Sequence, residues 1–138
     1  MYQQFIYFLL KTERHFCYEG LILVMKMEAT VYQPGHIDGN ERATSAMIRE
    51  ALEETGIAIS EDKLKMVHVM HGKSSEERID FFFEVTQWSG EPKITEKDKC
   101  DDLSWFSIDR LPQNMIPCVR AGIENYRNKI LFSEFGWD

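Results

Sequence analysis

With 138 residues, 43% of them apolar, the chain can form one compact domain with its own core but not two. A formal net charge of −7 argues against a surface that neutralises the phosphates of a nucleic-acid polymer. The three cysteines form no CxxC pair, and the apolar start MYQQFIYFLL is too short to span a bilayer. We therefore expect a single domain over residues 1–138 that is cytoplasmic and binds no membrane.

The chain alternates between stretches with the composition of strands and stretches with the periodicity of helices. Strands are expected at residues 5–10, 21–27, 65–71, 79–87 and 103–108, and helices at residues 44–54 and 116–127. Thr44 is a candidate N-cap of the first helix, and Gly56 is a candidate stop. Strands mixed with two helices predict an α/β fold, with a mixed sheet between helical layers.

The first expected helix carries an acidic cluster. At 100° per residue, Glu50, Glu53 and Glu54 fall within about a 100° arc. The opposite side carries the residues expected in the core, which are Ile48, Ala51, Leu52 and Thr55. Like charges at this spacing destabilise a helix unless a cation neutralises them, and convergent carboxylates suit Mg²⁺. A solvated acidic helix face is the alternative interpretation.

The spacing of residues around this helix is far more specific than the cluster alone. It follows the pattern Gx5Ex7REUxEExGU, in which U is a bulky aliphatic residue. The matching positions are Gly35, Glu41, Arg49, Glu50, Glu53, Glu54, Gly56 and Ile57. Ala51 is smaller than the pattern asks. This stretch resembles the signature of the Nudix hydrolases, and the resemblance continues through later segments to the terminal SEFGW.

The resemblance implies an α/β/α sandwich with a mixed sheet, in which the signature forms a loop, a helix and a loop. It also implies that Glu50, Glu53 and Glu54 bind Mg²⁺ or Mn²⁺, with the Gly35 carbonyl as a further ligand. Such ions neutralise phosphate charge and lower the pKa of the attacking water. Glu53 is the candidate general base within the signature. Outside it, Glu96 could supply the base or an extra ligand.

Other signature residues are implied to support the site. Arg49 and Glu41 would form an ion pair that fixes the helix against its entry loop and orients the carboxylates. Gly35 and Gly56 would supply backbone shapes that other residues adopt poorly.

Further side chains could contact a substrate, although structural roles are the alternative for each. Aromatic residues near strand ends could stack on a base, and histidines could contact phosphate. These residues are Trp88, Trp105, Phe106, His36, His68 and His71. The FSEFGW tail could dock on a partner subunit in a homodimer or pack on its own domain.

The expected function is hydrolysis of a phosphoanhydride in a small nucleotide-like substrate, a nucleoside diphosphate linked to another group. A nucleoside triphosphate that yields a monophosphate and pyrophosphate is the leading case. The first alternative is a Nudix-fold nucleotide-binding or regulatory domain without turnover. The second is an acidic helical interaction protein with an accidental motif, which predicts no metal binding and no mixed sheet.

The rest of the chain resembles a bacterial Nudix subgroup in which the segment before the signature is close to LLxRRxNTGYxDGxYxLPAGH. In this chain that segment is different. The family pattern reappears if the gene is read in a shifted frame, in which each codon consists of the third base of one codon and the first two bases of the next. Met25 and Lys26 then force glutamate, and Met27 and Glu28 force glycine. Read in this way, Cys17 to Pro34 can encode LRRANTGYEDGSYSLPA. We therefore predict that residues 1–34 are a frameshifted translation, which resequencing the source DNA would test.

Overall fold

The computed structural model describes residues 3–12, 21–26, 40–93, 102–111, 113 and 115–138. Two residues expected at the site, Gly35 and Glu96, lie outside these ranges.

The centre of the molecule is a six-stranded sheet with the strand order β5-β2-β1-β4-β3-β6. Its strands are β1 (Gln3–Thr12), β2 (Leu21–Lys26), β3 (Leu64–Lys73), β4 (Glu77–Val85), β5 (Asp102–Ser107) and β6 (Phe132–Phe135). The β1/β4 and β3/β6 pairs are parallel and the remaining pairs are antiparallel. The expected mixed sheet is confirmed.

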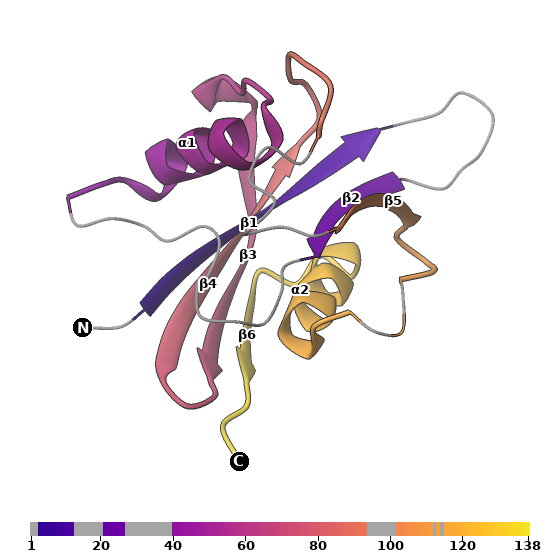
Figure 1. Ribbon diagram of the computed structural model, residues 1–138. Coiled ribbons are helices and arrows are strands. Elements are labelled where there is room, and N and C mark those ends of the chain that lie inside the picture. The colour runs from indigo at the N-terminus through magenta and orange to yellow at the C-terminus, as the bar shows by residue number, and fades with distance from the viewer. Residues whose placement is uncertain (1–2, 13–20, 27–39, 94–101, 112, 114) are drawn as a thin grey trace.

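Helices α1 (Ala43–Thr55) and α2 (Pro117–Arg127) cover opposite faces of this sheet (Figure 1). The alternation of side chains along β4 produces the two faces. Phe83 packs in the core cluster under α1, whereas its neighbour Phe82 packs in the cluster under α2. The layers are therefore helix, sheet and helix, as the α/β/α prediction requires.

The ends of α1 differ in how well the sequence indicated them. Gly56 ends the helix in the left-handed region, at φ 75°, and its N–H donates to the Leu52 carbonyl. The expectation that Thr44 caps the other end is wrong, because the N-cap is Arg42 and makes no side-chain capping bond. The Thr44 hydroxyl instead lies 3.4 Å from a carboxylate oxygen of Glu61, which also pairs with Arg42.

The buried face of α1 is also different from the expected one. Ala51 and Thr55 are fully buried as expected, but Leu52 is 54% exposed. Glu50 and Glu54 take part in the buried face instead. The helix is rotated relative to the expectation, since its buried residues include Met47, Glu50, Ala51 and Glu54, and Met47 and Ala51 pack in one cluster with Phe83 of the sheet.

The remaining expected elements are present, with ends shifted by one or two residues at most positions. One strand was not expected. The short β6 pairs in parallel with β3 and forms one edge of the sheet.

Helix α2 approaches the sheet closely because Gly122 has no side chain. A Cβ atom added at Gly122 would lie 2.1 Å from the ring of Phe82.

Candidate active site

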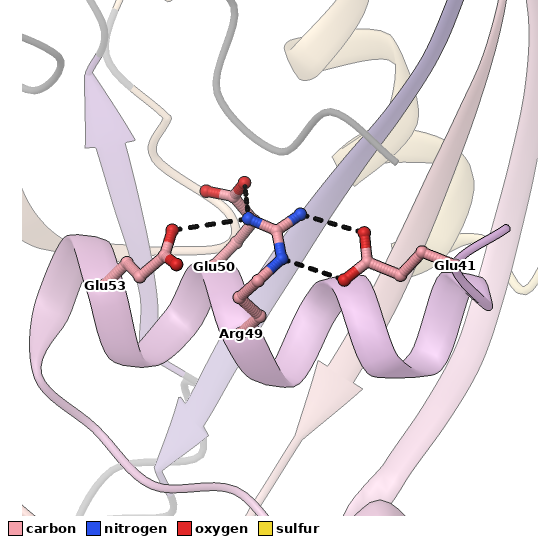
Figure 2. A network of polar contacts seen from close by, with 4 residues as sticks. All are labelled: Glu41, Arg49, Glu50 and Glu53. Atoms are coloured by element: carbon pink, nitrogen blue, oxygen red, sulfur yellow. Dashed lines mark hydrogen bonds and ion pairs between the residues drawn. The ribbon is translucent and has the colours of Figure 1, made fainter. Parts of the chain in front are cut away.

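The guanidinium group of Arg49 is the centre of a polar network on the acidic helix and contacts three carboxylates (Figure 2). Its Nε and Nη2 atoms donate to the two oxygens of Glu41 at 2.8 and 2.9 Å. Its Nη1 atom donates to Glu50 at 2.7 Å and to Glu53 at 3.3 Å. One side chain therefore joins the residue before the helix to two acidic residues of the helix.

The spacing in the sequence explains this network. Glu53 follows Arg49 by one helical turn, which places the two side chains on neighbouring positions of the helix surface. Glu41 precedes the helix and presents both oxygens to the planar guanidinium, a bidentate arrangement that fixes distance and orientation together. The hydrogen bond with Glu41 is the largest cause that raises the pKa of Arg49 above its usual value. Arg49 therefore remains a cation at this site.

The three candidate metal-binding glutamates have different environments. Glu50 is 8% exposed and Glu54 is 1% exposed, whereas Glu53 is exposed. An ionised carboxylate is costly to bury without a cationic partner or hydrogen bonds. For Glu50 this partner is Arg49. The helix therefore holds two acidic side chains, Glu50 and Glu54, on its buried side.

The donor set fits a hard divalent cation. Carboxylate oxygens are the ligands that Mg²⁺ and Mn²⁺ prefer, and those of Glu50 and Glu53 lie close enough together to contact the same nitrogen of Arg49. In the part of the chain that the structure describes, no three His, Cys, Asp or Glu side chains gather closely enough to hold a metal ion. Glu53 pairs with Arg49 on the exposed side of the helix.

Backbone contacts fix the end of α1 that carries these residues. The Thr55 carbonyl accepts a hydrogen bond from the backbone N–H of Lys93 at 3.0 Å. Ala58 and Ser89 form a bridge with two backbone hydrogen bonds of 2.9 Å. Gly90 lies close to the Gly56 carbonyl, since an added Cβ atom would be 3.2 Å from that oxygen. The segment that follows β4 therefore anchors the C-terminal end of the acidic helix.

The other candidate contact residues mostly have structural roles. His68 is fully buried, and its ring nitrogens lie 2.7 Å from the Ile130 carbonyl and from the Ser133 hydroxyl. His71 pairs with Glu77, and Trp88 packs against the core under α1. His36 and the side chains of Trp105 and Phe106 lie outside the described part of the chain.

One buried polar pair was not anticipated. Asp80 is fully buried on β4, and its Oδ2 atom accepts a hydrogen bond of 3.1 Å from Arg78 Nε. Among the described residues, no group donates to its other oxygen. Burial raises the pKa of Asp80 to about 6, although Arg78 acts in the opposite direction. The signal in the sequence is one acidic residue inside the otherwise apolar run IDFFF.

Comparisons with known proteins agree with this geometry. A family model described as the NUDIX domain matches residues 20–126. A Bacillus subtilis (strain 168) protein named putative 8-oxo-dGTP diphosphatase is 29% identical over 114 residues, which cover 80% of this chain and 72% of that protein.

Solved structures give the same fold. A MutT NUDIX hydrolase from Burkholderia pseudomallei is similar with a TM-score of 0.70 and 27% identity, over 88% of this chain and 97% of that one. The NUDIX domain of Shewanella oneidensis NrtR, solved in complex with ADP ribose, has a TM-score of 0.61 and 12% identity, over 79% and 75% of the two chains. In the described ranges, no helix has the length and apolar character needed to cross a membrane.

Proposed function

Because the chain belongs to the Nudix family of hydrolases, which act on phosphorus-containing acid anhydrides, we propose that it is a metal-dependent nucleotide pyrophosphohydrolase. The favoured substrate is a nucleoside triphosphate, which would give a monophosphate and pyrophosphate. One observation carries this proposal: two carboxylates of the acidic helix, Glu50 and Glu53, converge on a single cationic nitrogen. The name of the Bacillus subtilis relative supports a triphosphate substrate.

Residues of the acidic helix would bind the metal and accept the proton of the attacking water. Glu50, Glu53, Glu54 and the Gly35 carbonyl would hold Mg²⁺ or Mn²⁺, which when bound neutralises phosphate charge and lowers the pKa of water. The water oxygen forms a bond to phosphorus while the bridging P–O bond breaks and pyrophosphate leaves. The proton of the water passes to a carboxylate, for which Glu53 is the candidate within α1.

Glu96 is the candidate base or ligand outside the helix, and the contact of Lys93 with Thr55 supports it. This contact holds the chain at the end of α1, three residues before Glu96. Three residues of extended chain span at most about 11 Å. Glu96 is therefore within chain reach of the glutamates of α1.

We also propose that residues 1–138 form one Nudix domain whose residues 1–34 are atypical because of the shifted reading frame. A chain in which LRRANTGYEDGSYSLPA replaces residues 17–34 should then hydrolyse nucleotides faster than the present chain. An in-frame read of the source DNA would contradict the frameshift, whereas equal rates for the two chains would show that residues 17–34 do not limit turnover. The chain has three cysteines, an odd number that leaves one without a disulfide partner, and this supports a reducing, cytoplasmic location.

The direct test is release of phosphate or pyrophosphate from a panel of nucleoside triphosphates, nucleotide sugars and dinucleoside polyphosphates, with and without Mg²⁺. Glu53→Gln should lose at least about 100-fold in turnover if Glu53 takes the proton. Glu61→Gln is the matched control, because it makes the same chemical change at an exposed carboxylate outside α1. Equal turnover of Glu53→Gln and the control would remove Glu53 from the mechanism.

A nucleotide-binding domain without turnover is the second candidate. The similar NrtR domain was solved with ADP ribose, and the described residues do not assemble three metal ligands. Calorimetric titration with ADP ribose and with nucleoside triphosphates separates the two functions. Binding without release of phosphate or pyrophosphate from any compound would favour the second candidate.

A further inference from the structure

The Arg49 guanidinium occupies the position between two candidate metal ligands. Its Nη1 atom lies 2.7 Å from a Glu50 oxygen and 3.3 Å from a Glu53 oxygen (Figure 2). A divalent cation shared by these two carboxylates would have to lie in the same region. The guanidinium and the ion carry charges of the same sign, so they cannot both stay close to the same oxygens without strong repulsion.

The contacts of the guanidinium are unequal, and this decides which of them yields. Glu41 holds Nε and Nη2 with two short hydrogen bonds, and its side chain is only 18% exposed. The contact with Glu53 is the longest in the network, and the side chain of Glu53 is 44% exposed. The guanidinium can therefore release Glu53 while it remains bound to Glu41.

We propose that Arg49 is a resident counter-cation of this site, and that an incoming divalent ion displaces it from Glu53, its longest and most exposed contact, while Glu41 retains the guanidinium. The inference rests on the metal dependence proposed above. It assigns Glu41 a further task, since this carboxylate keeps Arg49 nearby in both states. In the absence of an ion, one oxygen of Glu53 is paired with Arg49, and this pairing ends when an ion binds.

The first experiment measures metal affinity rather than activity. Free Mn²⁺ is followed by electron paramagnetic resonance during titration of the natural chain, of Arg49→Gln and of Arg42→Gln. Arg42→Gln is the matched control, because it removes the same charge next to the same helix but contacts Glu61. Removal of the competing cation should raise the Mn²⁺ affinity of Arg49→Gln roughly two- to fivefold above that of the control, the range expected for one partly exposed ion pair.

The sign of the change separates this proposal from a purely orienting role of Arg49. If Arg49 only orients the carboxylates, Arg49→Gln should bind Mn²⁺ more weakly than Arg42→Gln, and the proposal is overturned. A double variant sharpens the result. Glu41→Gln should lower the Mn²⁺ affinity in the natural chain, because the freed guanidinium then remains on Glu50 and Glu53. The same change should have little effect in the Arg49→Gln background.

A second measurement does not depend on whether a variant folds. In the natural chain, ¹⁵N resonances of the Arg49 side chain are followed during titration with Mg²⁺. The Nε–H signal should persist because its bond to Glu41 is kept, while the Nη1 protons should exchange faster with water. Mg²⁺ binding with no change at Nη1 would overturn the displacement and leave the proposed function intact. Absence of any Mn²⁺ or Mg²⁺ binding to the natural chain would overturn both.

Discussion

The two faces of the sheet are held in different ways. Under α1 the contacts form one continuous apolar cluster that includes Met47, Ile57 and Phe83. Under α2 the apolar clusters are smaller, and polar pairs lie among them. These pairs are Arg78 with Asp80, Tyr126 with Glu84, and His68 with both Ser133 and Ile130.

The two kinds of contact place different demands on the geometry of the helices. Apolar packing is non-directional and strong, so it can hold α1 without using the side chains of Arg49, Glu50 and Glu53. Hydrogen bonds between buried groups demand fixed geometry and are expensive to leave unmade. The α1 face thus supports the candidate active site, whereas the α2 face trades apolar area for defined polar contacts.

The sharpest test of this comparison uses two adjacent phenylalanines on opposite faces. Phe83→Ala and Phe82→Ala should each lower the free energy of unfolding by about 3–5 kcal/mol, because both side chains are buried. Only Phe83→Ala should also weaken Mn²⁺ binding by the folded protein, since Phe83 packs under the acidic helix. Urea denaturation and Mn²⁺ titration measure the two effects. Equal Mn²⁺ affinity in the two variants would contradict the division between the faces.

The next effect concerns the close approach of α2 to the sheet. Gly122→Ala should destabilise the protein by about 1–3 kcal/mol, although alanine is the better helix former, because its Cβ atom would meet the Phe82 ring at 2.1 Å. If Gly122→Ala unfolds at the same urea concentration as the natural chain, α2 is seated more loosely than the contact indicates.

The sequence predicted the fold well because the elements that build it have strong local signals. The apolar runs of β3 and β4 and the periodicity of α2 are examples. It did not predict β6, whose four residues alternate in burial but are too short to give a pattern. This strand exists because β3 offers it a parallel partner, from Val69 to Gly72. Pairing over such a distance along the chain cannot be inferred from local composition.

The candidate site, too, was only partly predictable from the local sequence. The spacing of the signature located the acidic helix, and the resemblance to the Nudix hydrolases implied that Arg49 pairs with Glu41. It did not indicate that Nη1 of the same guanidinium would reach Glu50 and Glu53, because that depends on how the helix is rotated. The exposure of Leu52 has the same origin. An amphipathic helix whose buried face includes two carboxylates gives an ambiguous pattern, since the polar residues no longer mark the solvent side.

A smaller effect follows from the buried carboxylate under α2. Since the folded-state pKa of Asp80 is raised to about 6 from 3.8, the folded protein binds a proton more readily than the unfolded chain. Stability that depends on this group is therefore present at low pH and is lost as the pH rises toward and through 6. Between pH 5 and pH 7 the loss should be about 1 kcal/mol.

Urea denaturation at the two pH values measures this loss. Asp80→Asn should remove the pH-dependent difference, while Asp109→Asn should retain it, because Asp109 is an exposed carboxylate paired with Arg127. If Asp80→Asn and the natural chain lose the same free energy between pH 5 and pH 7, other groups cause the dependence.

The smallest effect is expected beside α1 itself, at the exposed pair of Arg42 and Glu61. Arg42→Ala should change the free energy of unfolding by no more than about 0.5 kcal/mol, because both side chains are more than half exposed and screened by solvent. The start of the helix does not depend on this pair, since the Arg42 carbonyl accepts the N–H of Ala46 whatever side chain is present. A larger loss that persists in 1 M salt would mean that polar contacts, and not only the apolar cluster, hold α1 on the sheet.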